Sequence, residues 1–307
     1  MKNIIIFSAP RSGSVLLSRI LSDAPNTINL GEFFSAGKAH VGKHLNNYIQ
    51  YIHNEYALGL ELYKPLMEKL SKLDADKLLH NDWIGINHQI SQYLTVDILK
   101  AYLQFMENPN FLLKIFHQHY TNDNHIDIHA LVDMFDVVII LYRENLIGHY
   151  ISFERAMETK VWSKGNKKYR SNRMDFSRHT RSAAKNHKKP YDNKTKIKWN
   201  INKYIRYYNK LQKSYQSFEE ISRLSGKPTV VIRYEDLDKQ KDKYQYVQKI
   251  LDDNNIDHKL IYSNEDPVLK QSVEGLPIED NFLNPERFIK EFSEDSIPKS
   301  LQFKLSQ

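Results

Sequence analysis

The fold of this chain is decided by residues 4–17, which read IIIFSAPRSGSVLL. The apolar run at the start has no polar alternation, as in a strand buried on both faces, and the apolar residues after the loop recur at helical spacing. Ligands of parallel α/β folds bind at such junctions, where a helix N-terminus offers free N–H groups to an anion. Gly13 lets the backbone curve around a phosphate, and Arg11 adds a planar positive charge. Ser12 and Ser14 add hydroxyl donors, so the stretch predicts an anion-binding loop.

The loop differs from the P-loop of nucleoside triphosphate enzymes. The Gly-Lys-Ser/Thr ending is missing, because Gly13 is followed by Ser14. The strongest β run, residues 136–142, leads into Arg143 and not into an Asp that could hold Mg²⁺. A P-loop-type kinase is therefore the weaker alternative. The 13 His residues show no zinc-ligand spacing and the chain has no Cys, so no metal site is predicted.

Apolar runs and helical patterns alternate along the rest of the chain. Further strands are predicted at residues 111–116, 136–142 and 229–232. Helical patterns cover residues 41–104, 126–135, 144–159, 195–218 and 238–253, with a stripe at 204–218 that predicts core packing. Apolar strands that are each followed by a helix indicate a parallel sheet covered on both faces. We therefore predict an α/β fold of three layers, a P-loop-like arrangement in which helices flank a central parallel β-sheet, with helix-rich insertions and a single domain over residues 1–307.

The positive charge of the chain is concentrated in one segment. Residues 160–198 hold 14 Lys or Arg and two acidic residues, a balance of +12 against +7 for the whole chain, which leaves −5 elsewhere. With almost no aliphatic side chains the segment cannot form a core, so we expect a basic loop insert at about residues 163–195. It is either a solvated loop, a collar that concentrates an anionic ligand, or a basic arm for nucleic acid. The acidic remainder disfavours a nucleic-acid-binding protein, which stays the alternative from another class.

No stretch approaches about 18 consecutive apolar residues, and the N-terminal apolar run is too short for a signal peptide. We therefore expect a cytoplasmic protein without a transmembrane segment. The abundance of Lys, Asn and Ile is typical of an AT-rich genome, bacterial or phage-like.

Four motifs, in order along the chain, resemble those of sulfotransferases that use 3′-phosphoadenosine 5′-phosphosulfate (PAPS). Residues 9–17 resemble the 5′-phosphosulfate loop of that family, and residues 142–152 (YRENLIGHYIS) resemble its 3′-phosphate motif. Residues 231–237 (VIRYEDL) resemble a strand end that recurs in the family. Residues 31–34 (GEFF) and 153–162 are similar to the bacterial carbohydrate branch, typified by trehalose and nodulation-factor sulfotransferases.

The resemblance implies transfer of a sulfuryl group from PAPS to a hydroxyl of a carbohydrate or glycolipid, by in-line displacement with a general base. The product would be adenosine 3′,5′-bisphosphate (PAP), and no metal is implied. The 5′ end of the nucleotide would be held by Arg11, Ser12, Gly13, Ser14, Val15 and Leu16, and the 3′-phosphate, at the far end, by Arg143 and Ser152. Lys270 and Gln271 lie in a segment that resembles the one closing over the nucleotide. The family loop usually reads Ser-Thr where this chain has Ser14-Val15, so one phosphate-binding hydroxyl is missing.

The same resemblance implies the catalytic residues. Glu32 would be the general base that takes the proton of the acceptor hydroxyl. His117 is the rival base, because residues 114–117 end a strand at the same edge of the sheet. Lys114 matches a family Lys that would stabilise the leaving oxygen, a role shared with Arg11. The expected partner is a small-molecule or glycan acceptor, anionic if the basic insert faces it; no stable nucleic acid is expected, and a homodimer is left open.

Overall fold

A computed structural model gives the architecture of the chain. It describes residues 2–34, 64, 68, 95–105, 110–121, 126–159, 195–261 and 277–292. Nearly all of the basic insert, residues 160–194, lies outside these ranges, as do Lys270 and Gln271. So does most of the region 41–104; helix α6 (Val96–Phe105) is its described end.

In the part of the chain that the structure describes, parallel strands form one sheet in the order β2-β3-β1-β4-β5. Their bounds are β1 Ile4–Ser8, β2 Thr27–Gly31, β3 Asn110–Ile115, β4 Val137–Tyr142 and β5 Thr229–Arg233. Every residue of the central strand β1 is buried, as its unbroken apolar run predicts. The register pairs Phe7 with Ile115 and Ser8 with Leu141. The carboxyl ends of the three central strands are therefore level, and the loops that follow them meet at one edge.

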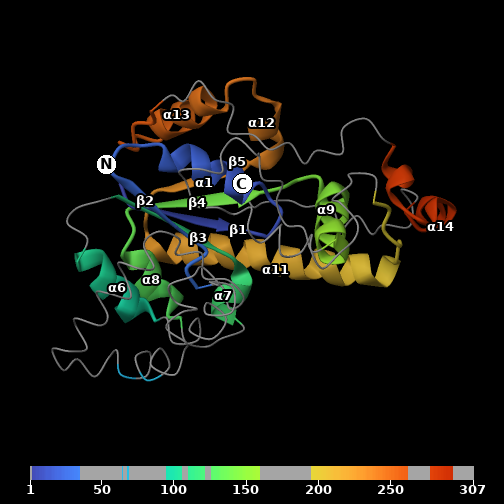
Figure 1. Cartoon of the computed structure of the whole chain (residues 1–307), viewed down its shortest axis with the longest axis horizontal. Helices are drawn as coiled ribbons and strands as arrows, with labels where there is room; N and C mark the ends of the chain where they lie inside the picture. Colours follow the sequence, from blue (N-terminus) through green and yellow to red (C-terminus); the bar gives the residue numbers. More distant parts are fainter. Residues whose placement is uncertain are drawn as a thin grey trace, which may run out of the picture.

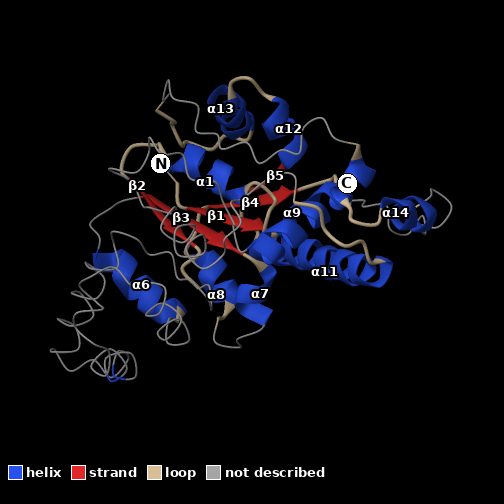
Figure 2. Cartoon of the chain, turned by 45° about the vertical axis from the view of Figure 1, so that its right-hand side comes forward, coloured by secondary structure: helices blue, strands red, loops and turns tan. Residues whose placement is uncertain are grey.

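Helices cover both faces of this sheet (Figure 1). One face carries α1 (Ser14–Ser22), α12 (Tyr234–Lys239) and α13 (Lys243–Asp253), which share an aliphatic core with the sheet. The other face carries α6, α7 (His117–Thr121), α8 (Ile128–Asp133) and the long α11 (Ile201–Ser225). The strands lie between the two helical layers in the turned view as well (Figure 2). The predicted three-layer α/β fold is confirmed.

Helix α11 runs along the helical layer that also contains α6, α7 and α8, below the sheet in Figure 1. Its first turn is capped by Asn200, whose side chain accepts a hydrogen bond from the N–H of Lys203, and it ends at Gly226 with a φ of 63°. The predicted core stripe is buried against the sheet and α9, and consists of Tyr204, Tyr208, Leu211, Tyr215 and Phe218. This helix therefore reaches from the amino end of β5 to the carboxyl ends of the strands, where the loops meet.

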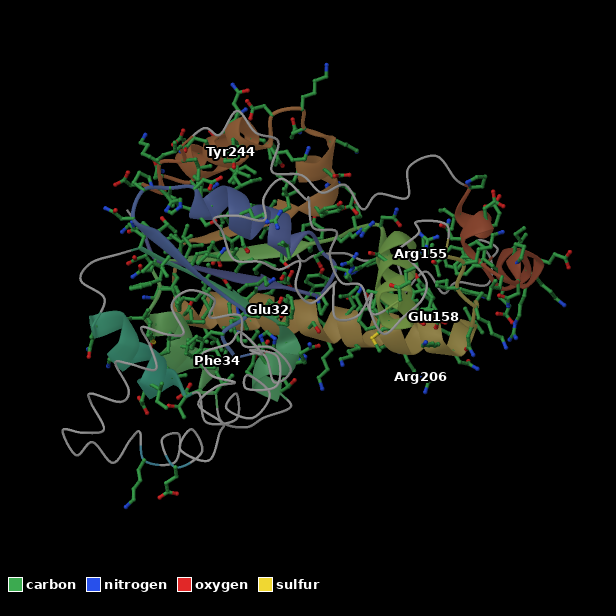
Figure 3. The ribbon with its side chains drawn as sticks, viewed as in Figure 1. Glu32, Phe34, Arg155, Glu158, Arg206 and Tyr244 are labelled. Carbon is green, nitrogen blue, oxygen red and sulfur yellow. The ribbon has the colours of Figure 1, made fainter. Side chains whose placement is uncertain are left out.

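A third packed cluster lies beyond that edge. It joins α9 (Leu146–Thr159) to the 3₁₀ helix η4 (Ile278–Asn281) and α14 (Pro285–Glu291), around the fully buried Trp199. Arg155 on α9, at the right of Figure 3, donates hydrogen bonds to the carbonyl of Thr195 at 2.8 Å and to Oδ1 of Asn281 at 2.7 Å. The buried guanidinium thus fastens α9 to two segments that are distant in sequence.

Several elements differ from the sequence prediction, among them α7, a helix of five residues that was not predicted. Strand β2 was not predicted, because it is a half-buried edge strand that contains Asn29 and ends at Gly31. The helix predicted at residues 238–253 is instead two helices, α12 and α13, separated by the extended Gln240 and by Asp242, which caps α13. An Asp that caps a new helix is a local stop-and-start signal that the apolar periodicity does not reveal.

Candidate functional site

The loop after β1 has an unusual backbone. Arg11 has a φ of 75° and Gly13 a φ of 83°, both in the left-handed region. A Cβ on Gly13 would lie 2.3 Å from Cδ2 of Tyr234, so the ring of the 231–237 motif closes tightly over the loop. Among the described residues, no side chain caps the N-terminus of α1. The N–H groups at the start of this helix are therefore donors suited to an anion.

The residues predicted to bind the 5′ end of the nucleotide lie in the loop after β1 and in the first turn of α1. Ser12 and Ser14 are buried in the loop and at the start of α1, while Val15 and Leu16 continue the first turn. The N–H of Leu16 already donates to the carbonyl of Gly13 at 2.9 Å, so this N–H is engaged within the helix. The donors best placed for a ligand are thus those nearest Gly13.

Arg11, Arg143 and Ser152 lie in contact, and we call these three residues the arginine patch. Nε of Arg11 donates to Oγ of Ser152 at 3.1 Å, and Nη1 of Arg143 donates to the backbone carbonyl of Arg11 at 3.4 Å. The cause is topological, because β1 and β4 are neighbouring strands whose following loops lie side by side. We expected the residues for the two phosphates at opposite ends of the nucleotide, and the structure brings these residues into direct contact.

Arg143 is held by the 231–237 motif. Its guanidinium carbon lies 4.9 Å from the centre of the Tyr234 ring, and its Nε lies 3.8 Å from Oε1 of Glu235. Glu235 in turn accepts hydrogen bonds from the backbone N–H groups of Glu144 and Asn145, at 3.0 and 2.9 Å. Nε of Arg143 is itself buried and makes no hydrogen bond to a described residue. Because the nearest carboxylate oxygen, that of Glu235, lies beyond hydrogen-bond distance, this buried N–H can still donate to an anionic ligand.

Two residues that the sequence analysis did not assign to the site also support the loops. Tyr215 on α11 lies 3.2 Å from Oγ of Ser12 and accepts the N–H of Arg143 at 3.3 Å, so one phenol joins both loops. Burial raises the pKa of Tyr215 to about 12, which keeps the hydroxyl protonated. Sequence reasoning could have found Tyr215 because it lies in a predicted core stripe, and a buried phenol needs a hydrogen-bond partner.

His149 on α9 is the second such residue. Its Nε2 lies 2.7 Å from the carbonyl of Pro10, and because a carbonyl only accepts, this nitrogen carries the proton. Burial, followed by the charges of Arg143 and Arg11, lowers the pKa of His149 to about 3. The neutral ring therefore anchors the backbone next to Arg11 without adding to the positive charge.

Glu32 and Lys114 form an ion pair beside the loops. Nζ of Lys114 lies 2.7 Å from Oε1 of Glu32, with 4% of the Lys114 side chain exposed and 18% of that of Glu32. A bulge between Asn29 and Gly31, where Gly31 has a φ of 58°, brings Gly31 opposite Leu113. The residues that follow, Glu32 and Lys114, are therefore neighbours. Figure 3 shows Glu32 near the middle of the molecule.

The two histidines of α7 lie in different surroundings. His119 is 4% exposed, and the charges of both Glu32 and Lys114 act on it. His117 is half-buried, its ring packs edge-to-face on Tyr120 and Phe218, and burial together with nearby lysines of α11 lowers its pKa. Within the described part of the chain, an ion pair joins Glu32 to Lys114, and no hydrogen bond or ion pair joins Glu32 to His117.

Two searches of the described residues and two comparisons with known proteins bear on the class of protein. Within the described ranges, no group of three or more His, Asp or Glu could hold a metal ion, and no helix is long and apolar enough to cross a membrane. A search of the curated proteins found no match. The family model described as Stf0 sulphotransferase matches residues 3–274, which include both loops, the ion pair and the 231–237 motif. The chain, as its motifs predicted, therefore belongs to the Stf0 sulphotransferase family.

Proposed function

We propose that this chain transfers a sulfuryl group from PAPS to a hydroxyl of a carbohydrate or glycolipid and releases PAP. Membership of the sulphotransferase family supports sulfuryl transfer to a carbohydrate acceptor. The arginine patch supports the choice of donor, since two guanidinium groups and an uncapped helix N-terminus suit a ligand with two phosphate groups. The buried Nε of Arg143, which has no hydrogen-bond partner among the described residues, is the observation that carries the proposal.

The residues of the patch divide the nucleotide between them. The N–H groups of Gly13, Ser14 and Val15, with Arg11, would hold the 5′ end, whereas the N–H of Ser12 already donates to the carbonyl of Ala9 at 3.3 Å. Arg143 and Ser152 would hold the 3′-phosphate. Their mutual contacts fix the two guanidinium groups before a ligand binds, which lowers the entropic cost of binding.

Glu32 and Lys114 supply the chemistry next to this patch. Sulfuryl transfer resembles phosphoryl transfer in that alignment and charge stabilisation do most of the work. A bound PAPS supplies the sulfuryl group and leaves as PAP. Glu32 takes the proton of the acceptor hydroxyl while the oxygen of that hydroxyl attacks sulfur. The electrons of the broken S–O bond leave with the 5′-phosphate oxygen. Lys114, 2.7 Å from Glu32, compensates the charge of the carboxylate before the reaction and that of the leaving oxygen during it.

Nucleotide binding is the direct test of the donor. We expect PAP to bind in the presence of EDTA, as measured by calorimetry, and Arg143→Ala to weaken binding roughly 10- to 100-fold, because it removes charge-assisted hydrogen bonds. Arg223→Ala is the matched control, since Arg223 is exposed in the last turn of α11, at the other edge of the sheet. Tighter binding of ATP with Mg²⁺ than of PAP would instead favour a kinase.

Turnover tests the base. We expect Glu32→Gln to reduce transfer of labelled sulfate to a panel of sugars by about 10²- to 10⁴-fold, the usual contribution of a general base, with PAP affinity unchanged. His117→Gln should retain most of the activity, because His117 does not contact Glu32. Full activity of Glu32→Gln, or loss of activity in His117→Gln alone, would contradict the assignment.

A further inference from the structure

His119 has one nitrogen that is engaged and one that is not. The backbone N–H of Phe116 donates to Nδ1 of His119 at 3.2 Å, and the two rings pack with their centres 5.0 Å apart. His119 is the third residue of α7, the position from which a side chain reaches back to the first N–H of a helix. A nitrogen that accepts a hydrogen bond carries no proton, so the neutral ring carries its proton on Nε2.

The Nε2–H of His119 is a buried donor without an acceptor among the described residues. Buried polar groups in folded proteins are nearly always paired, so this N–H marks a place where another molecule can supply the acceptor. Capping alone does not explain the choice of residue, because Glu or Gln caps a helix from this position equally well. Burial lowers the pKa of His119 to about 4, so near neutral pH the ring donates as an uncharged group.

The surroundings of this donor indicate its ligand. Nζ of Lys114 lies 5.2 Å from the centre of the Phe116 ring, on which the His119 ring packs, and Lys114 and Glu32 already neutralise each other as an ion pair at 2.7 Å. An uncharged donor beside a neutralised pair suits the lone pair of an uncharged oxygen better than an anion. Neighbouring hydroxyl groups of a sugar ring provide such oxygens next to the hydroxyl that reacts.

We propose that His119 binds the acceptor, its Nε2–H donating a hydrogen bond to a sugar oxygen adjacent to the hydroxyl that Glu32 deprotonates. This inference rests on the proposed sulfotransferase function and extends it to recognition of the acceptor. A site that hydrogen-bonds a substrate hydroxyl discriminates strongly against an analogue that lacks it, because the protein group is then left unpaired. His119 is thus a determinant of which hydroxyl is sulfated.

Two substitutions separate binding of the acceptor from capping of α7. In His119→Asn, Oδ1 stands near the former Nδ1 and still accepts the N–H of Phe116, but no donor reaches the position of Nε2. In His119→Gln, the longer amide places an N–H at that position. We expect His119→Asn to lower kcat/KM for the sugar roughly 10- to 100-fold with PAP affinity and Tm unchanged, and His119→Gln to recover most of this loss.

A series of deoxy sugars identifies the partner oxygen. With trehalose as the first probe, and otherwise the best substrate of the sugar panel, wild-type enzyme should lose activity toward one monodeoxy derivative about as much as His119→Asn loses toward the parent sugar. His119→Asn should not distinguish that derivative from the parent. A role confined to the structure of α7 would not produce this coupling between one side chain and one hydroxyl.

The outcomes distinguish this inference from the function on which it rests. Full activity of His119→Asn, which keeps the hydrogen bond from the N–H of Phe116, would assign His119 to the cap alone and overturn the proposal. Equal losses in His119→Asn and His119→Gln with a lower Tm would assign the losses to the packing of the buried ring and would overturn it as well. So would an enzyme that binds PAP and sulfates a sugar but shows no coupling to any hydroxyl. An enzyme that binds PAP and sulfates no sugar would contradict the carbohydrate acceptor of the proposed function. Failure of the wild-type chain to bind PAP would instead overturn the proposed function.

Discussion

Arg11 occupies the left-handed backbone region at a φ of 75°, a conformation that costs a residue with a side chain about 1–2 kcal/mol relative to Gly. Such strain persists where the surrounding structure enforces it, and here the contacts to Ser152 and Arg143 do so. The chain keeps an Arg at a position where Gly would be more stable. We infer that the guanidinium is needed more than the stability.

At the residue scale we therefore predict that two substitutions of Arg11 weaken PAP binding alike but differ in the stability of the folded protein. Arg11→Gly and Arg11→Ala both remove the guanidinium, and both should weaken PAP binding at least about tenfold. The free energy of unfolding of Arg11→Gly should nevertheless exceed that of Arg11→Ala by about 1 kcal/mol, because a φ of 75° strains Ala but does not strain Gly. Urea denaturation and calorimetry on the two variants measure both quantities. An Ala variant as stable as the Gly variant would show that the backbone relaxes on loss of the side chain.

At the scale of elements, the bulge in β2 positions Glu32, the proposed base. Gly31, at a φ of 58°, lets the strand take an extra residue, and the N–H of Gly31 is held by Oδ1 of Asn29 at 2.9 Å. Bulges re-aim the side chains that follow them, and here Glu32 is brought to Lys114. The ion pair therefore depends on the register of an edge strand as well as on its own two residues.

We predict that Gly31→Ala reduces kcat by roughly 10- to 100-fold through displacement of Glu32, while PAP affinity stays within about twofold because the nucleotide loop follows β1, two strands away. Gly226→Ala is the matched control. It imposes a similar positive-φ cost, at 63°, where a Cβ would meet no atom within 4 Å, and it lies at the C-terminus of α11. Steady-state kinetics should show a loss of activity in Gly31→Ala only; equal losses in both variants would attribute the effect to general destabilisation.

For the whole molecule, buried neutral histidines make stability depend on pH. Burial lowers the pKa of His149 to about 3 and that of His119 to about 4, from an ordinary value of 6.5. Between these values the unfolded chain binds more protons than the folded chain, so this stabilisation is complete above pH 6.5 and is lost as the pH falls. Each of the two histidines should lower the free energy of unfolding by roughly 2 kcal/mol as the pH falls from about 7 to about 5.

Denaturation at the two pH values tests this prediction through His149→Gln. Gln can still donate to the carbonyl of Pro10 but does not titrate, so the variant should lose roughly 2 kcal/mol less than wild type on acidification. His129→Gln, at an exposed position on α8, should leave the difference as in wild type. An unchanged pH dependence in His149→Gln would mean that the ring becomes protonated in the folded state.

The sequence alone predicted much of the fold but only individual members of the site. Strands β1, β3, β4 and β5 follow from unbroken apolar runs, and the stripe of α11 follows from helical periodicity; both signals are local. Strand β2 escaped prediction because short, half-buried edge strands lack that signal. His119 was passed over for His117, two residues away, because a turn of five residues gives no periodicity from which to tell its inner face from its outer face.

By itself, the sequence determined that a loop with Gly and Ser residues lies between a buried strand and a helix, and that an Arg follows a second buried strand, because both depend on residue types at short spacing. Only the tertiary structure decided that Arg143 contacts the backbone of Arg11, that Tyr215 and His149 support these loops, and that Glu32 meets Lys114. The reason is physical: these contacts depend on which strands are neighbours, on their register and on positive-φ turns. Such features arise from the packing of the whole sheet, and no local window of sequence contains them.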